Sequence, residues 1–226
     1  MRLSFAASLL ALTALLTAVP AAAEDDGQAW GMMLVQGPIT GDLVFWAEVQ
    51  TRFSDDASRL GQALVRPAIG VRLATDTTAH LGYAYVRTEP LGGRATDEHR
   101  VWQQLSFPIL RNARGLYVWG RSRVEQRILE GREDTGWRLR QFVRAQMPIR
   151  RGGALSGVIY TEGFYNANAT DWGARTGVDQ WRTFVGVSAP IAKGVVLEPG
   201  YLNQTVFRRG EDRMNHIASL NLFVRL

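Results

Sequence analysis

Polar and apolar residues alternate along most of this chain with a period of two. Between Leu116 and Arg127, one parity holds Tyr117, Trp119, Arg121, Arg123, Glu125 and Arg127, and the other holds Leu116, Val118, Gly120, Ser122 and Val124. Successive side chains of a β-strand point to opposite faces, so this segment predicts a strand with one charged face and one apolar face. The next segment repeats the pattern, with Arg138, Arg140 and Arg144 on its polar parity.

Segments of this kind recur along the chain and predict ten strands. Each spans about 10 to 14 residues, which is longer than the usual soluble strand of about 5 to 6 and enough to cross a bilayer at a tilt. The predicted strands are Leu43–Phe53, Leu60–Leu73, Ala79–Thr88, Glu98–Phe107, Leu116–Arg127, Gly136–Met147, Leu155–Phe164, Gly177–Ser188, Val195–Phe207 and Asn215–Leu226.

The connections between these strands alternate in length. The short ones lie at residues 74–77, 108–113, 148–153 and 189–193, and the longer, more polar ones at 89–97, 128–135, 165–176 and 208–213. Bacterial outer-membrane barrels have short periplasmic turns and long external loops. If Leu226 ends at the periplasm, every long connection falls outside, so the pattern predicts a single antiparallel up-and-down transmembrane barrel.

One segment disturbs the strand count. Residues 28–36 also alternate and are followed by a tight turn at 37–41, which makes eleven strands. Single-chain bacterial barrels have even strand numbers. We therefore expect ten to twelve strands and favour twelve, with a further short strand near residues 24–29; the alternative is that residues 30–36 fold inside the lumen.

The N-terminus has the features of a secretory signal peptide. A charged start and a short apolar run lead to a small-residue site at Ala21-Ala22-Ala23, which predicts a signal peptide over residues 1–23 and a barrel over 24–226. The alternative, an N-terminal membrane anchor, needs a longer apolar run. The chain has no Cys, which excludes a lipid anchor at Cys and any disulfide.

The polar parity is expected to face the lumen. An Arg on the lipid face near the midplane costs about 2–4 kcal/mol, and a dozen charged residues there would prevent insertion. A soluble β-sandwich, or a lipocalin-like barrel with its apolar face inward, would also alternate. The strand lengths, the seven Trp and six Tyr, and the presence of Lys193 as the single Lys favour the membrane barrel.

The predicted lumen carries both signs of charge, with Arg in excess. Rings of Arg select anions in pores, and Arg binds carboxylate or phosphate through two hydrogen bonds, so the excess predicts contact with anions. The alternative is a salt-bridged core that fills the lumen. The expected anion-contacting residues are Arg52, Arg100, Arg121, Arg123, Arg127, Arg138, Arg140, Arg144 and Arg182, and their expected acidic partners are Glu48, Glu98, Glu125, Glu162 and Glu198.

Enzyme chemistry finds little support in the sequence. The three His residues, His80, His99 and His216, are scattered, and Ser122 is outward-phased and distant from His216, so no Ser–His pair is expected. The same His residues form no cluster at metal-ligand spacing, and no nucleotide-binding motif is present. We therefore expect no catalytic residues, no metal and no cofactor, with a lipid hydrolase as the alternative.

Several polar motifs occur in the order found in one family. These are Trp30, Glu48 to Arg52, Arg100-x-Trp102-x-Gln104, Arg121-x-Arg123-x-Glu125-x-Arg127, Arg138-x-Arg140-x-x-x-Arg144, Glu162-x-Phe164 and Gln180-x-Arg182. In this order the chain resembles a family of bacterial outer-membrane barrels known only as domain-of-unknown-function family number twenty-four ninety. The resemblance covers nearly all of the chain after residue 23 and implies a barrel without an assigned activity. The chain departs from outer-membrane barrels in ending with Leu226, because such barrels usually end in an aromatic residue.

Together these features predict a Gram-negative outer-membrane protein that is porin-like or structural. We expect a narrow channel that favours anions or acidic solutes; the alternative is a plugged, salt-bridged barrel that binds a ligand or a lipid head group at its outer rim. The expected partners are outer-membrane lipid, the barrel-assembly machinery and a small anionic solute. An exported chain is not expected to meet nucleic acid, despite its formal charge of +5, and the sequence leaves the oligomeric state open.

Overall fold

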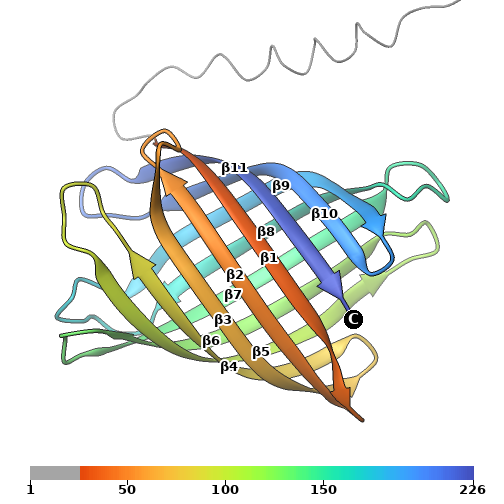
Figure 1. Ribbon diagram of the computed structural model, residues 1–226, viewed down its shortest axis with the longest axis horizontal. Coiled ribbons are helices and arrows are strands. Elements are labelled where there is room, and N and C mark those ends of the chain that lie inside the picture. The colour runs from red at the N-terminus through yellow and green to blue at the C-terminus, as the bar shows by residue number, and fades with distance from the viewer. Residues whose placement is uncertain (1–25) are drawn as a thin grey trace, which may run out of the picture.

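The computed structural model describes residues 26–226, which form one closed β-barrel (Figure 1). The strands are β1 (Asp26–Thr40), β2 (Leu43–Ser54), β3 (Arg59–Ala74), β4 (Thr77–Thr88), β5 (Thr96–Arg111), β6 (Tyr117–Leu129), β7 (Thr135–Pro148), β8 (Ser156–Asn166), β9 (Gly177–Ala192), β10 (Val195–Val206) and β11 (Arg213–Arg225). The ten strands expected from alternation correspond to β2 to β11. The expected signal peptide over residues 1–23 lies outside the described residues.

The barrel has eleven strands, so the expected count of twelve is wrong. Each strand pairs with its sequence neighbours in antiparallel fashion, and β1 closes the barrel by pairing with β11 in parallel, for example Met33 with Leu222. The two-residue turn at 41–42 makes β1 antiparallel to β2. Because strand direction alternates along the chain and the number of strands is odd, the first strand, β1, runs in the same direction as the last, β11. Residues 30–36 therefore belong to the wall, and neither a twelfth strand nor a segment folded in the lumen is present among residues 26–226.

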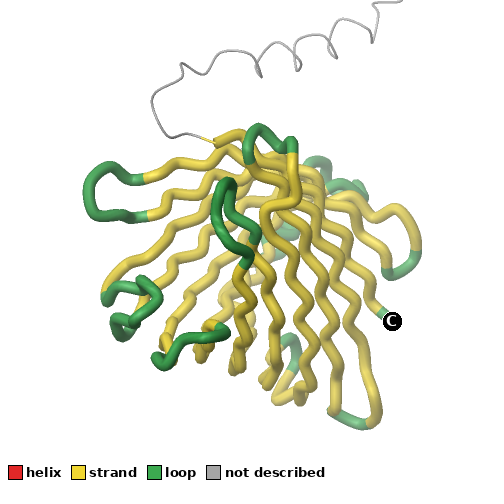
Figure 2. The backbone as a smooth tube through the Cα atoms, turned by 60° about the vertical axis from the view of Figure 1, so that its left-hand side comes forward, coloured by secondary structure: helices red, strands yellow, loops and turns green. Residues whose placement is uncertain are grey.

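The connections gather at the two rims of the barrel, where the tube view places them (Figure 2). One rim, the long-loop end, carries the start of β1 and residues 55–58, 89–95, 130–134, 167–176 and 207–212; the other, the short-turn end, carries 41–42, 75–76, 112–116, 149–155 and 193–194. The grouping agrees with the sequence, although the connection at 149–155 is longer than a tight turn. No helix within residues 26–226 is long and apolar enough to cross a membrane.

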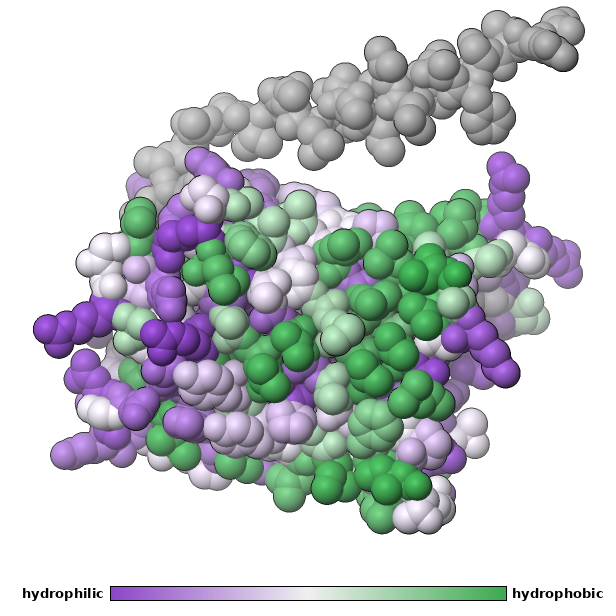
Figure 3. Space-filling model, in the orientation of Figure 1, coloured by the Kyte–Doolittle hydropathy of each residue, from purple (hydrophilic) through white to green (hydrophobic). Residues whose placement is uncertain are grey.

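The two faces of the wall differ as the alternation predicts. Large apolar side chains point outward and are exposed around the barrel, among them Ile69, Leu81, Val185 and Leu220. On the face drawn in the space-filling view, hydrophobic residues cover the middle and right of the barrel, and hydrophilic ones gather toward its ends (Figure 3). The inward side chains are mostly buried, and many of them are charged.

Two apolar clusters also lie inside the lumen. One consists of Val158, Phe184, Leu202 and Ile217, with Trp30 and Tyr160 packed against it; the other consists of Ala68, Ala84 and Trp102, with Trp46 packed against it. The ring of Trp102 crosses Gly82 so closely that a Cβ there would lie 2.3 Å from the ring. Glycine on β4 therefore makes room for an inward indole from β5, and the lumen is packed with side chains of both kinds.

Candidate functional site

The candidate site is a set of charged side chains in the lumen, named here the lumen network. It consists of ten arginines and five glutamates on the inward parity: Arg52, Arg66, Arg100, Arg121, Arg123, Arg127, Arg138, Arg140, Arg144 and Arg182, with Glu48, Glu98, Glu125, Glu162 and Glu198. All the expected site residues belong to it. Sequence alternation thus predicted which charges enter the lumen.

The centre of the lumen network joins β6, β7 and β8 around two carboxylates. Glu125 accepts from Arg138 Nη2 at 2.6 Å and from Arg140 Nη1 at 2.7 Å. Arg140 also donates to Glu162 at 2.8 Å, and Arg121 reaches the same Glu162 oxygen at 2.7 Å. Because charge-assisted hydrogen bonds of this kind are strong and directional, the carboxylates hold these guanidinium groups in place.

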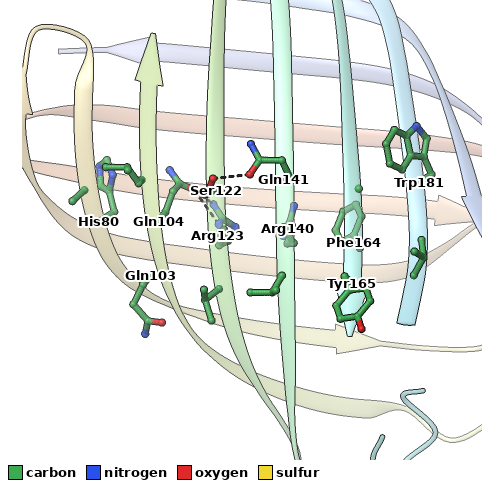
Figure 4. Close-up of a pocket in the computed structure, with 16 residues that line it drawn as sticks. His80, Gln103, Gln104, Ser122, Arg123, Arg140, Gln141, Phe164, Tyr165 and Trp181 are labelled. Atoms are coloured by element: carbon green, nitrogen blue, oxygen red, sulfur yellow. Dashed lines mark hydrogen bonds between the residues drawn. The ribbon is translucent and has the colours of Figure 1, made fainter. Parts of the chain in front are cut away.

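Arg123 lies beside this centre in a row of inward side chains that crosses neighbouring strands (Figure 4). Its Nε and Nη2 atoms donate to Gln104 Oε1 at 2.9 and 2.5 Å, and its guanidinium carbon lies 4.2 Å from the centre of the Trp102 ring. Glu125 is 3.5 Å from Arg123 Nη1, which is farther than a hydrogen bond of normal length. Arg123 is therefore held by a neutral amide and an aromatic face as well as by a charge.

Two further glutamates pair with arginines of the wall. Glu98 accepts from Arg100 at 2.7 Å and from Arg127 at 2.6 Å. Glu48 accepts from Arg66 at 2.8 Å, across the β2–β3 pair. Glu48 and Arg52 share a face of β2, as the sequence indicates, but Arg52 bonds to glutamines instead.

One pair reaches past intervening strands. Arg144 on β7 donates two hydrogen bonds to Glu198 on β10, at 2.8 and 2.6 Å. Strands β8 and β9 lie between them in the sheet order. Glu198 is fully buried. The pair therefore crosses the lumen side of two strands and contributes to filling it.

The six arginines that β6 and β7 contribute to the lumen network thus all lie within 4 Å of a carboxylate. Charge is nevertheless unbalanced, because ten arginines of the lumen network face five glutamates. Among residues 26–226, Arg52 and Arg182 are the members of the lumen network with no carboxylate within 4 Å. The two lumen-network arginines that lack a carboxylate partner therefore lie on β2 and β9, and both belong to the expected anion-contacting residues.

The loop at 167–176 covers part of the long-loop end. Trp172 donates from Nε1 to the carbonyl oxygen of Asp134, and its ring lies 4.9 Å from the guanidinium carbon of Arg127. Asp171 and Asp134 bond reciprocally between the two loops. The rim above β6 and β7 is therefore capped by side chains of the chain itself.

The histidines lie apart from one another, and two of them bond to tyrosines on the outer wall. His99 is 2.5 Å from the Tyr83 hydroxyl, and His216 is 2.6 Å from the Tyr201 hydroxyl. Ser122 is exposed on the outside and donates to Gln141, and both residues line a pocket together with Tyr165 and Trp181 (Figure 4). Within residues 26–226, no group of three or more His, Cys, Asp or Glu residues is arranged to hold a metal ion.

Several residues that shape the site are not among the residues expected to contact anions or to pair with them. Arg66 has the inward parity and could have been included with the other arginines. Trp102 and Trp30 also lie on the inward parity of their strands. The sequence does not indicate, however, that arginines lie over their rings. The rim pair of Asp26 and Arg213, at 2.9 Å, joins residues 187 positions apart and has no local signal.

The comparisons with known proteins agree with the motif order in the sequence. A family model described as a protein of unknown function (DUF2490) matches residues 27–215. An uncharacterized protein of Methylorubrum extorquens is 38% identical over 221 residues, which cover 96% of this chain and 96% of that protein. No solved structure matches the chain. The chain belongs to the DUF2490 family of proteins of unknown function.

Proposed function

We propose that this protein is an outer-membrane β-barrel whose lumen is closed to ions by its own side chains, and that it binds an acidic solute at its long-loop end. The observation that carries this proposal is the burial of the lumen network at mid-barrel. Arg123, Glu125 and Glu198 are at most 2% exposed. Because these side chains are packed against their neighbours, we expect a hydrated ion to find no path past them.

The outer wall supports the membrane location. Its strands are 11 to 16 residues long, and its exposed outward positions hold aliphatic residues together with aromatic ones such as Trp137, Trp181 and Tyr201. Such a wall would expose a large apolar surface to water, whereas in a bilayer it meets lipid tails. In this proposal the wall contacts outer-membrane lipid, the chain reaches it through a cleaved signal peptide, and the barrel-assembly machinery inserts it.

Planar-bilayer recording tests the closed lumen. We expect the purified protein to insert without unitary currents in symmetric KCl. We expect the double variant Arg144→Ala with Glu198→Ala to conduct, because it removes the pair that crosses two strands. Arg114→Ala, at an exposed turn of the short-turn end, is the matched control and should stay silent. Steady currents from the unchanged protein would overturn the proposal.

A narrow anion channel is the second candidate. The excess of Arg over Glu in the lumen network favours it, because a positively charged pore attracts anions. If the unchanged protein conducts and prefers anions, and replacing Arg121, Arg123 and Arg140 reduces that preference, this candidate replaces the closed barrel.

A further inference from the structure

Two lumen arginines are held by neutral groups in place of carboxylates. Arg52 donates from Nη1 to Gln62 Oε1 at 2.7 Å and from Nη2 to Gln50 Oε1 at 2.8 Å. Its buried Nε has no acceptor among the described residues. Amide oxygens orient a guanidinium group without cancelling its charge, so Arg52 keeps a full positive charge.

Arg182 on β9 has the same surroundings. It donates from Nη2 to Gln180 Oε1 at 3.1 Å. Gln204 Nε2 donates to the same Gln180 oxygen at 2.8 Å, so Gln204 holds Gln180 in place. Glutamine amides therefore position both of the arginines that lack a carboxylate.

Trp30 on β1 brings these arginines together. The guanidinium carbon of Arg52 lies 4.1 Å from the centre of the Trp30 ring, and that of Arg182 lies 5.0 Å from it. The nearest acid along β1, Asp26, is engaged by Arg213 and Gln28. Two like charges thus share one aromatic ring with no carboxylate between them, which is a costly arrangement unless an anion joins it.

The Arg52 side of the pair is less buried than the lumen network at mid-barrel. Trp30, Gln50, Arg52, Gln62 and Gln180 are half-buried, whereas Arg182 is buried beneath them at 9% exposed. They line β1, β2, β3 and β9, whereas the loop carrying Trp172 covers β6 and β7. A small solute that enters from the long-loop end would therefore meet Arg52 on the side of the rim that this loop leaves uncovered.

We infer that Arg52 and Arg182 form a binding site for a phosphate group. Two guanidinium charges match a dianion, and Arg binds phosphate oxygens through paired hydrogen bonds. The four glutamines preserve this charge, because Glu in their place would neutralise it. The inference deepens the proposed function by naming the chemistry of the acidic solute and the residues that hold it.

The group has two sources with the same chemistry, inorganic phosphate in solution and a phosphate monoester at a lipid head. The experiment uses the full barrel in zwitterionic detergent and follows Trp fluorescence and calorimetric heat at constant ionic strength. One arm titrates inorganic phosphate, with chloride as the comparison anion. The other arm titrates a short-chain phosphatidic acid, with the matching short-chain phosphatidylcholine as the comparison.

The variants distinguish phosphate binding at this site from a general electrostatic attraction of phosphate to a basic protein. We expect Arg52→Gln and Arg182→Gln to weaken phosphate binding about tenfold or more, and Gln62→Glu and Gln180→Glu to do the same by adding a carboxylate. Arg94→Gln removes an exposed charge from the loop at 89–95 on the same rim and should leave the affinity within about twofold of the unchanged protein. Circular dichroism establishes that each variant is folded.

The outcomes decide the inference independently of the closed lumen. Phosphate binding that depends on both arginines supports it, and phosphatidic acid binding with the same dependence but no inorganic phosphate binding assigns the site to lipid. Absence of binding in both arms, or binding that the four site variants leave unchanged, overturns it. If the barrel conducts ions and also binds phosphate through these arginines, only the proposal of a closed lumen is overturned. If the barrel gives no currents and binds neither ligand, only the proposed phosphate site is overturned.

Discussion

Single buried charges in the lumen network depend on their partners. Glu125 is fully buried and lies within 4 Å of three guanidinium groups, those of Arg123, Arg138 and Arg140. Desolvation of such ions is costly, and only their mutual attraction and hydrogen bonds offset it. Removal of one shared carboxylate therefore leaves several buried cations uncompensated.

We expect Glu125→Gln to lower the free energy of unfolding by about 3–5 kcal/mol, the range for a buried pair that loses one partner. Urea unfolding of the detergent-solubilised barrel, followed by circular dichroism, measures this change. Glu130→Gln, at an exposed residue of the loop at 130–134, is the control and should change stability by less than about 0.5 kcal/mol. Equal effects of the two substitutions would contradict the role assigned to Glu125.

Packing at Gly82 gives a second prediction for a single residue. We expect Gly82→Ala to cost about 1–3 kcal/mol, because the added methyl group would overlap the Trp102 ring in a filled lumen. Gly157→Ala on β8, where a Cβ would meet its nearest neighbour at 4.0 Å, should be nearly neutral. The same unfolding measurement compares the two variants, and a neutral Gly82→Ala would show that Trp102 moves freely.

The sequence predicted the inward side of nearly every charged residue but not the partner of each. Alternation assigns a face because the strand period is two, whereas pairing depends on how far neighbouring strands are staggered. Glu48 therefore bonds to Arg66 on the next strand in place of Arg52 on its own strand, and Arg144 finds Glu198 at a distance of 54 residues. No local pattern carries that information.

At the scale of strands, β1 is the element that the sequence placed least well. Its alternation predicts a strand, but the partner that closes the barrel is the last strand of the chain. The expectation of an even count rested on the even strand numbers of single-chain bacterial barrels. An even count would close the barrel with an antiparallel pair, whereas β1 pairs with β11 in parallel. Closure is a long-range property, so it could not be read from the residues of β1.

The parallel pairing of β1 with β11, called the parallel seam below, can be tested by cross-linking, because the chain has no Cys of its own. We expect Met33→Cys combined with Leu222→Cys to be joined by a short thiol cross-linker, because these residues are partners in β1 and β11. A gel shift after cross-linking measures the joining. Met33→Cys with Leu197→Cys places the second thiol one strand farther, on β10, and should react much less. Cross-linking of the second pair alone would refute the seam.

At the scale of the whole molecule, the barrel has a charged interior and an apolar exterior, the reverse of a soluble barrel that binds lipids. The sequence predicted this inversion from the cost of placing Arg in lipid. It did not predict that the interior would be so fully packed, because filling depends on strand number and stagger.

After reconstitution into lipid, we expect the tryptophans to differ in their contact with acyl chains and therefore in the quenching of their fluorescence. Lipids brominated on their tails should quench Trp137 and Trp181, which are 48% exposed on the outer wall, and should spare the fully buried Trp102. Trp181→Phe should therefore reduce the quenchable fraction of the fluorescence, and Trp102→Phe should increase it. Equal quenching in both variants would contradict insertion of the wall into the bilayer.

The parallel seam also separates the ends of the barrel-forming chain. Asp26 begins β1 at the long-loop end, and Leu226 follows β11 at the short-turn end. In an even-numbered barrel both ends share a rim and a few residues can join them. Here a circular permutant would need a linker that runs the full height of the barrel, and fluorescent or epitope tags fused at the two ends would report opposite sides of any membrane that the barrel spans.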